Sequence, residues 1–325
     1  MLTRRQTSRV LLAAALPQLW VSQASAQDAW PKKSINLVVG FAPGGAIDTV
    51  ARIVAQHLTQ KLGQTVVVQN RPGAGGNIAQ QQVYLAEPDG STVLLAAIGS
   101  LVINPRLMKL PYNPRDLAPV SLAASFPNIL VVKSDLGVRT VQEFINLARK
   151  DPMRVSFASG GVGTASHLAG EMFNQRAGLN ILHVPFQGGA PAMTALLGGQ
   201  VTAYYATPSS AQAFIESKQV VALATTGPER TSDMPSVPTL SESGFKGFNA
   251  TNWYAFLLPA KTPAALVKRW NTELVAVLSA PEVVAAFAQH GLVPKASTPE
   301  ALASFIDSET AAWGKVITER NIDLK

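Results

Sequence analysis

The chain has 325 residues, of which 47% are apolar and 14% are charged, and this composition is that of a globular protein rather than a disordered or membrane-embedded one. Its net charge of +7 comes from scattered lysines and arginines, with no basic stripe interleaved with aromatic side chains, so nucleic-acid binding is not expected. No cysteine occurs, which excludes disulfides, thiol catalysis and cysteine-based metal sites.

The first 26 residues have the pattern of an export signal. A basic start with Arg4, Arg5 and Arg9 precedes a mostly apolar run, residues 10–21, that is shorter than the roughly 20 residues of a membrane span. The small-x-small sequence ending at Ala26 predicts cleavage there, and hence an exported mature chain that starts near Gln27. Because the signal carries three arginines and no acid, the mature net charge is +4, a mild field that favours small anions. The arginine pair also resembles a twin-arginine signal, so the export route stays open.

After the signal, short β-branched runs alternate with stretches of helical periodicity, which is typical of an α/β sheet with parallel crossovers. Strands are predicted over residues 35–40, 65–69, 92–97, 129–132, 155–158, 181–184, 201–205 and 220–224. Helices are predicted for most of the intervals between them. The first helix carries Ile47, Val50, Val54 and Leu58 on one face and ends before Gly63.

The C-terminal third predicts helices over residues 264–278, 282–289 and 299–320. Thr262 and Thr298 each precede a proline, so both are predicted to cap the helix that follows. A chain that leaves one α/β lobe, builds a second and returns to end on the first would show this order. We expect residues 27–124 plus 252–325 to form lobe 1 and residues 125–251 to form lobe 2, with crossover segments near 122–127 and 245–253.

Two glycine junctions, each between a strand and a helix, echo one another: FAPGG at residues 41–45 and FASGG at residues 157–161. The first N–H groups of a helix have no intrahelical partner, and the helix dipole places partial positive charge there. Glycine lets a ligand approach the backbone closely, so Gly44 and Gly45 in one loop and Gly160 in the other are predicted to cradle an oxyanion. Two such helix starts could converge on one molecule if the lobes face each other.

Polar side chains at these helix starts leave alternatives open. Asp48 could complement the helix dipole or accept a hydrogen bond from the ligand. Thr164 is a natural N-cap whose hydroxyl could also meet a ligand, and His167 could be either a neutral donor or a packed structural residue. Ser166 lies beside His167 in sequence, but adjacent helical side chains point in different directions and do not make a catalytic pair.

Other chemistries find little support in the motifs. Gly161-Val162-Gly163 resembles part of a dinucleotide fingerprint but lacks its last glycine or alanine and the following acidic residue. There is no phosphate loop, no GxSxG elbow and no HExxH spacing, so we expect no cofactor and no metal. The segments at 70–82 and 183–201 repeat the strand, glycine and helix order, and the second is a candidate third set of backbone donors.

Taken together, these segments resemble the solute-binding receptors of tripartite tricarboxylate transporters, the Bug family. The resemblance covers nearly the whole mature chain and rests on FAPGGAIDTVAR (41–52), VVVQNRPGAGGNIA (66–79), PDGSTVLLA (88–96), ASGGVGTASHLAGEMF (158–173), HVPFQGGAPAMTALLGGQV (183–201), LATTGPERTSDMPSVPTLSESGF (223–245) and W..F..PA.TP (253–263).

The resemblance implies a two-lobed, type II-like periplasmic binding protein fold, each lobe a mixed sheet flanked by helices, closing over a small organic anion. It carries ligand contacts onto two loops, at Phe41, Ala42, Gly45 and Asp48, and at Ser159, Gly160, Thr164, Ser166 and His167. Many relatives have an aspartate soon after the strand that follows GGQV, where this chain has Ala206 and Thr207. That departure favours a carboxylate ligand without an amino group.

We therefore expect a monomeric periplasmic receptor, not an enzyme, that captures a di- or tricarboxylate and passes it to the membrane components of a transporter or to a sensor. An exported enzyme acting on a small carboxylate is the alternative. A cytoplasmic effector-sensing domain is a third possibility, which the export signal contradicts.

Overall fold

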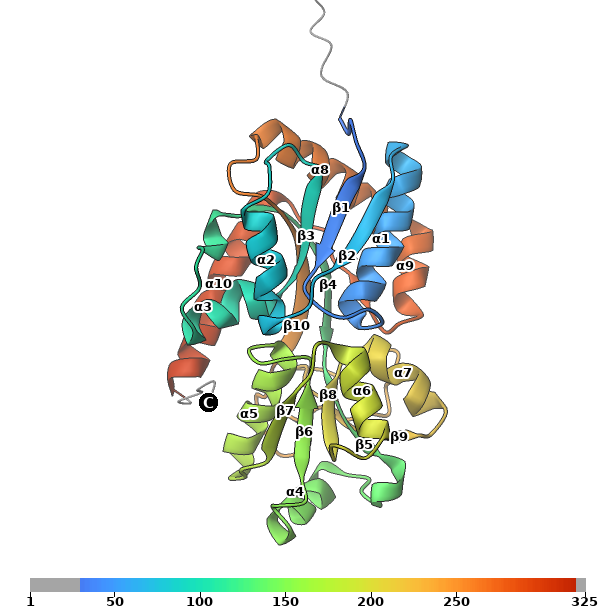
Figure 1. Cartoon of the computed structure of the whole chain (residues 1–325). Coiled ribbons are helices and arrows are strands. Elements are labelled where there is room, and N and C mark those ends of the chain that lie inside the picture. The colour runs from blue at the N-terminus through green and yellow to red at the C-terminus, as the bar shows by residue number, and fades with distance from the viewer. Residues whose placement is uncertain (1–29, 320–325) are drawn as a thin grey trace, which may run out of the picture.

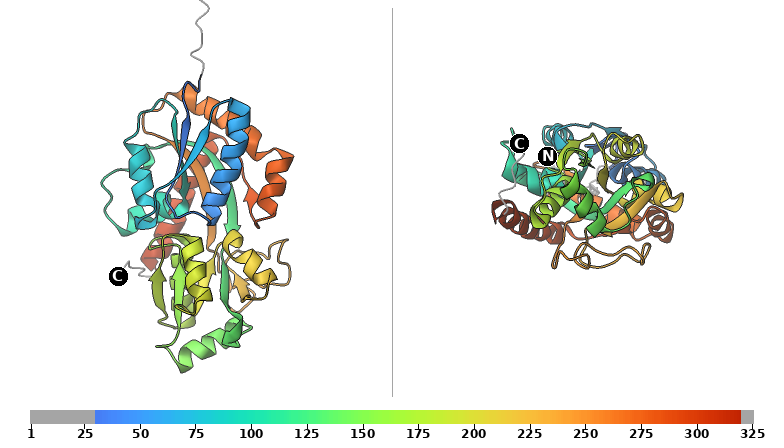
Figure 2. Two further views of the ribbon diagram at one scale, coloured as in Figure 1. Left: turned by 45° about the vertical axis from the view of Figure 1, so that its right-hand side comes forward. Right: turned by 90° about the horizontal axis from the view of Figure 1, so that it is seen from below.

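The computed structural model describes residues 30–319, so the predicted signal lies outside the described part of the chain. The described residues form two lobes stacked end to end, each a β-sheet flanked by helices (Figure 1). The same two-lobed arrangement is seen after a turn of 45° about the vertical axis (Figure 2, left). The predicted fold class, an α/β protein with two mixed sheets, is confirmed.

Lobe 1 is built on a six-stranded sheet with the order β11-β4-β10-β3-β1-β2. β1 is parallel to both β2 and β3, whereas β10 runs antiparallel to β3 and β4, and β11 antiparallel to β4. The strands are β1 (Ile35–Val39), β2 (Val66–Asn70), β3 (Thr92–Ala97), β4 (Ala118–Pro127), β10 (Thr251–Leu258) and β11 (Val293–Pro294).

Helices cover both faces of this sheet. They are α1 (Ala46–Leu62), α2 (Asn77–Tyr84), α3 (Asn104–Leu107), α8 (Ala264–Leu278), α9 (Pro281–Ala288) and α10 (Pro299–Glu319). Alternate residues of β1 point to opposite faces. Leu37 and Val39 therefore join the core formed with α1, α8 and α9, and Val38 joins the core formed with α2 and α10.

Lobe 2 is built on a five-stranded sheet with the order β7-β6-β8-β5-β9, in which β6 is parallel to β7 and β8, and β5 is antiparallel to β8 and β9. Its strands are β5 (Ile129–Lys133), β6 (Ser156–Ser159), β7 (Leu182–Pro185), β8 (Ala203–Ala206) and β9 (Val220–Thr225). Its helices are α4 (Val141–Lys150), α5 (Ala165–Ala177), α6 (Gly189–Leu197) and α7 (Pro208–Glu216).

The chain passes between the lobes at two adjacent places. β4 ends at Pro127 and β5 begins at Ile129, while the return passage enters β10 at Thr251. The two passages are held together at Thr226, whose N–H donates to the carbonyl of Asn128 at 2.9 Å and whose carbonyl accepts from Ala250 at 2.8 Å. A connection made of only two neighbouring backbone segments suits a hinge.

Most predicted elements occur within two residues of their expected bounds. No strand was predicted where β4 lies. Its sequence is rich in Ala and Ser and has prolines near both ends, so it lacks the β-branched signal of a strand. It forms because it pairs along its length with β10. The cap prediction at Thr298 is confirmed by a bond from the Ala301 N–H, whereas Thr262 donates its hydroxyl to Pro259 and α8 begins only at Ala264.

Within residues 30–319 no single helix is long and apolar enough to cross a membrane; α8 and α9 meet the length and composition test only as a pair, bent by 66°.

Candidate functional site

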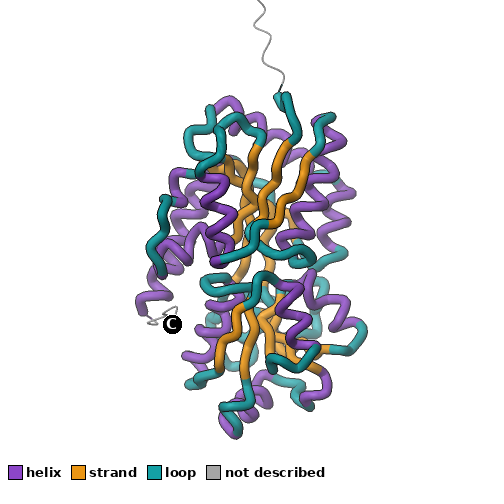
Figure 3. Tube along the Cα trace, viewed as in Figure 1, coloured by secondary structure: helices purple, strands orange, loops and turns teal. Residues whose placement is uncertain are grey.

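The parallel strands of both lobes end at the surface where the lobes meet. In lobe 1 the carboxyl end of β1 leads into α1, and in lobe 2 the ends of β6, β7 and β8 lead into α5, α6 and α7. Loops consequently gather between the two sheets (Figure 3). Ligands of open α/β sheets bind outside the carboxyl ends of the strands, so this junction is where a site is expected.

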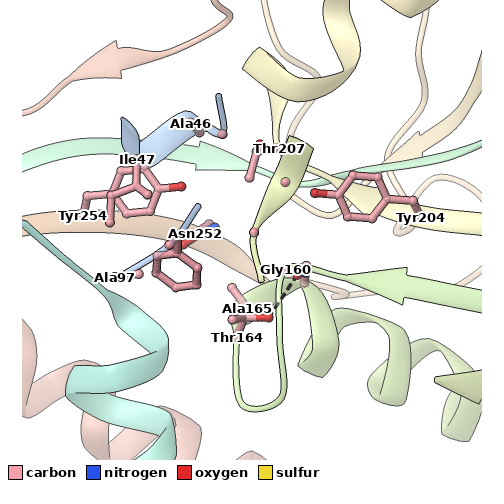
Figure 4. Close-up of a pocket in the computed structure, with 15 residues that line it drawn as sticks. Ala46, Ile47, Ala97, Gly160, Thr164, Ala165, Tyr204, Thr207, Asn252 and Tyr254 are labelled. Carbon is pink, nitrogen blue, oxygen red and sulfur yellow. Dashed lines mark hydrogen bonds between the residues drawn. The ribbon is translucent and has the colours of Figure 1, made fainter. Parts of the chain in front are cut away.

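A cavity of about 40 Å³ lies at this junction and is lined from both lobes (Figure 4). Lobe 1 contributes Phe41, Gly45, Ala46, Ile47, Ala97, Asn252 and Tyr254. Lobe 2 contributes Gly160, Thr164, Ala165, Ser166, Gly188, Gly189, Tyr204 and Thr207. At about 10–15 Å³ for each water, this space holds only a few water molecules.

The N-termini of four helices converge on this cavity. The N-cap residues of α1, α5, α6 and α7, which are Gly45, Thr164, Gly188 and Thr207, all line it. The caps of α1, α6 and α7 make no side-chain hydrogen bond to the first turn, so no capping side chain stands between these helix starts and a ligand. Among the described residues that line the cavity there is no lysine, arginine, aspartate or glutamate. Its positive potential therefore comes from backbone dipoles.

A network of hydroxyls holds the start of α5 in place. Thr164 Oγ1 donates to the carbonyl of Gly161 at 2.6 Å and lies 3.0 Å from Ser166 Oγ. Because the single hydroxyl hydrogen of Thr164 is used on Gly161, Ser166 donates to Thr164. Ser166 Oγ also accepts the Gly160 N–H at 3.1 Å, the contact drawn in Figure 4. The loop is thus fixed from within.

Glycines let the two lobes touch backbone to backbone. The Ala42 N–H donates across the junction to the carbonyl of Gln187 at 2.8 Å. A Cβ on Gly45 would lie 3.3 Å from the nitrogen of Gly189, and a Cβ on Gly188 would lie 3.3 Å from the nitrogen of Ala42. Side chains at these positions would hold the lobes apart.

The structure brings five of the ten sequence-predicted site residues to the cavity: Phe41, Gly45, Gly160, Thr164 and Ser166. The other five, Ala42, Gly44, Asp48, Ser159 and His167, do not line it. Ala42 forms the contact between lobes, and Gly44 donates its N–H to Asp48 at 3.0 Å.

Asp48 is buried and fully engaged by its own lobe. Its carboxylate accepts hydrogen bonds from Arg52 Nε at 2.8 Å, from the Gly44 N–H at 3.0 Å and from Asn70 Nδ2 at 2.9 Å. Burial alone would raise the pKa of Asp48, but these bonds outweigh burial and hold the pKa below its ordinary value. Of its two predicted roles, the geometry favours ordering the loop over contacting a ligand. The pairing with Arg52 also offsets a negative charge beside the α1 N-terminus.

Replacing Asp48 with alanine is expected to lower the free energy of unfolding by about 1–3 kcal/mol, because the part-buried hydrogen bonds from Gly44 and Asn70 to a charged acceptor are lost. Arg52→Met is the matched control. The Arg52 side chain is 55% exposed, and its loss leaves the other two bonds of Asp48 intact, so the cost is about 1 kcal/mol or less. Urea unfolding of both variants measures the difference. Equal costs would contradict the loop-ordering role.

His167 belongs to a buried cluster behind the α5 loop. Its ring stacks on His183 with centroids 3.9 Å apart, and its Nδ1 accepts the Gly163 N–H at 3.2 Å. His183 Nε2 lies 2.6 Å from Ser159 Oγ. Burial lowers the pKa of His167 to about 4, and burial together with the neighbouring His167 lowers the pKa of His183 to about 3. Both rings are neutral at pH 7, and of the two predicted roles of His167 the packed one is favoured.

Sequence reasoning did not select the side chains that complete the cavity. Tyr204, Asn252 and Tyr254 lie on strands, where a polar or aromatic residue looks like an ordinary sheet position. Thr207 follows a strand and could have been found by treating every strand-to-helix junction alike, whereas Gly189 lies in the segment 183–201 that was predicted as a third set of backbone donors. Within residues 30–319 no group of three or more His, Asp or Glu side chains could hold a metal ion.

Solved structures with this fold come from periplasmic binding proteins. That of BugD superposes with a TM-score of 0.87 at 34% identity, covering 90% of this chain and 99% of BugD. An R. palustris protein with adipate gives a TM-score of 0.86 at 31% identity, with coverages of 90% and 99%. MatC of Rhodopseudomonas palustris with bound malate superposes with a TM-score of 0.84 at 29% identity, covering 89% of this chain and 100% of MatC. The chain is therefore a two-lobed solute-binding protein of the periplasmic class.

The sequence comparisons are more specific. A family model described as the tripartite tricarboxylate transporter family receptor, TctC, matches residues 50–322. A UPF0065 protein of Pseudomonas sp. strain P51, from the tcbD-tcbE intergenic region, is 39% identical over 97% of this chain and 95% of its own length. BugT of Bordetella pertussis is 35% identical over 92% of both chains. This chain belongs to the TctC family of tripartite tricarboxylate transporter receptors, so it is a binding protein and not an enzyme.

Proposed function

We propose that this receptor captures a small organic carboxylate in the cavity between its lobes and closes over it. The observation that carries the proposal is the convergence of four helix N-termini on a cavity whose described lining has no charged side chain. Unpaired N–H groups and helix dipoles attract an anion and disfavour a cation. Without lysine or arginine, the site suits a carboxylate better than a polyphosphate.

A ligand amine has no counter-charge in this cavity. Thr207 and Ala206 occupy the end of β8, where many relatives carry an aspartate, and Thr207 lines the cavity through its helix cap. Asp48, the acid in the first turn of α1, accepts hydrogen bonds from Arg52 and Asn70. The proposed ligand is therefore a carboxylate without an amino group. The relatives solved with adipate and with malate support this choice of chemical class.

The proposal includes where the receptor works. Residues 1–26 direct export and are removed near Ala26, which leaves a soluble, monomeric receptor in the periplasm. Membership of the TctC family implies the membrane components of a tripartite transporter as its partners. Delivery to those components, or to a membrane sensor, follows lobe closure on the hinge at Thr226.

Isothermal titration calorimetry of the mature receptor against C3–C6 carboxylates tests the proposal. We expect at least one carboxylate to bind roughly tenfold or more tightly than its neutral primary amide, because several helix N-termini act on the charge. The amino-substituted counterpart of the same carboxylate should bind more weakly. Binding of an amine or a neutral amide in preference to every carboxylate would contradict the proposal. Mass spectrometry of small molecules released from the purified protein gives an independent identification.

A further inference from the structure

A buried, unpaired amide lies on the lobe 1 side of the cavity. Asn252 is only 7% exposed and lines the cavity, and its Oδ1 has no hydrogen-bond partner within the described residues. Its Nδ2 makes no side-chain hydrogen bond there either. Burying an amide without partners is costly, so such a group in a native structure calls for a partner that the protein chain does not supply.

Two tyrosine hydroxyls accompany this amide. Tyr254 follows Asn252 by two residues on β10, which places both side chains on the same face of the strand. Tyr204 comes from β8 in the other lobe, and the two hydroxyl groups point inward from opposite sides (Figure 4). Burial raises the pKa of Tyr204 to about 12 and raises that of Tyr254 above its ordinary value, so both remain neutral hydroxyls.

The chemistry of this wall differs from that of the helix N-termini. Helix N-termini offer only donors, which suits a carboxylate. Asn252 offers an acceptor as well as donors, and its buried Oδ1 needs a donor from the ligand. A second carboxylate or a ketone would leave that oxygen unpaired. An ammonium group would satisfy it, but no acid lines the cavity and the helix dipoles oppose a cation.

We propose that Asn252 is a specificity-determining residue that reads a hydroxyl group on the ligand, so that the receptor takes small hydroxycarboxylates in preference to their deoxy counterparts. A hydroxyl donates to Asn252 Oδ1 and accepts from its Nδ2 or from a tyrosine hydroxyl. This inference rests on the proposed function, because the helix N-termini must hold the carboxylate for the hydroxyl to reach Asn252.

Matched pairs of acids test the inference without any variant. Malate and succinate differ only by a hydroxyl group, as do lactate and propionate. Calorimetry of the wild-type receptor is expected to show roughly tenfold tighter binding of the hydroxylated member, the size of a typical net hydrogen bond. If carboxylates bind but neither pair shows this preference, Asn252 is satisfied by water and the inference is overturned while the proposed function stands. If no carboxylate binds at all, the proposed function itself fails.

Variants of Asn252 then test whether this residue causes the preference for the hydroxylated acid. Asn252→Leu, close in size and without polar atoms, is expected to reduce the malate-to-succinate affinity ratio to about one. Asn252→Asp is expected to weaken both acids, because it places a negative charge beside the carboxylate. Asn249→Leu, in the exposed loop just before β10 and outside the cavity, is the control and should keep the wild-type ratio. If Asn252→Leu still binds malate more tightly than succinate by the wild-type ratio, Asn252 does not determine the specificity.

Discussion

Replacing Gly99 with valine is expected to prevent the lobes from closing while each lobe stays folded. Gly99 begins the π-helical turn Gly99–Ile103 in lobe 1, directly after β3. A Cβ there would lie 2.6 Å from the carbonyl oxygen of Gly163 and 3.2 Å from the Cα of Thr164, both in lobe 2. Unlike neighbouring Gly75, Gly99 does not have a positive φ, so a larger residue strains no backbone. The three nearest atoms that a Cβ would meet therefore all belong to lobe 2.

Overpacking of this kind costs about 3 kcal/mol, or about a hundredfold in affinity if binding requires closure. The measurements are calorimetry with the tightest carboxylate of the C3–C6 panel and small-angle X-ray scattering with and without it. Wild-type protein should contract on binding and Gly99→Val should not. Gly314→Ala in α10 is the control, since its Cβ would meet only the flexible end of Arg106 at 3.4 Å. If Gly99→Val binds the carboxylate with wild-type affinity, ligand binding does not require the lobes to approach this closely, and the prediction is wrong.

Acidification from pH 7 to pH 5 is expected to lower the free energy of unfolding by about 2–4 kcal/mol through the pair His167 and His183. The folded pKa values, about 4 and about 3, lie below the ordinary value of 6.5. As the pH falls below 6.5, both histidines become protonated in the unfolded chain but stay neutral in the folded chain. The contribution of the two histidines to the free energy of unfolding is fully present above pH 6.5 and is lost as the pH falls toward the folded pKa values.

The size follows from about 1.4 kcal/mol for each pH unit and each group. Between pH 6.5 and pH 5, one histidine contributes about 2 kcal/mol, and two contribute about twice that. Glu171, whose Oε1 lies 3.8 Å from His167 Nε2, acts the other way. Burial raises its pKa, so the folded state gains a proton there as the pH falls, and this offsets part of the loss.

Urea unfolding at several pH values measures the slope, and the double variant His167→Gln/His183→Gln should flatten it between pH 7 and pH 5. Proton NMR of the two imidazole rings gives a second measure. In the folded protein their signals should show no protonation at pH 5, where an exposed imidazole with the ordinary pKa of 6.5 is mostly charged. Two rings that titrate near 6.5, together with an unchanged slope, would contradict the buried neutral pair.

The two glycine junctions show which features of the site can be predicted from local sequence. FAPGG and FASGG each lie between a strand and a helix, and residues of both loops line the cavity. The same argument could not tell which side chains near each helix start face inward. Asp48 and His167 sit within the first turn of their helices, yet both turn away toward partners in their own lobe. Thr164, the N-cap of α5, and Ser166, the second residue of that helix, line the cavity.

The sequence by itself determined the alternation of strands and helices, the apolar faces that bury them and the free helix N-termini that favour an anion, because these follow from periodicity, capping and glycine content over a few neighbouring residues. Only the tertiary structure decided that β4 is a strand, since its pairing partner β10 lies more than a hundred residues away. It also decided that Tyr204, Asn252 and Tyr254 face one cavity. Their meeting depends on how two separately folded sheets pack against each other, and no local pattern in the chain carries that information.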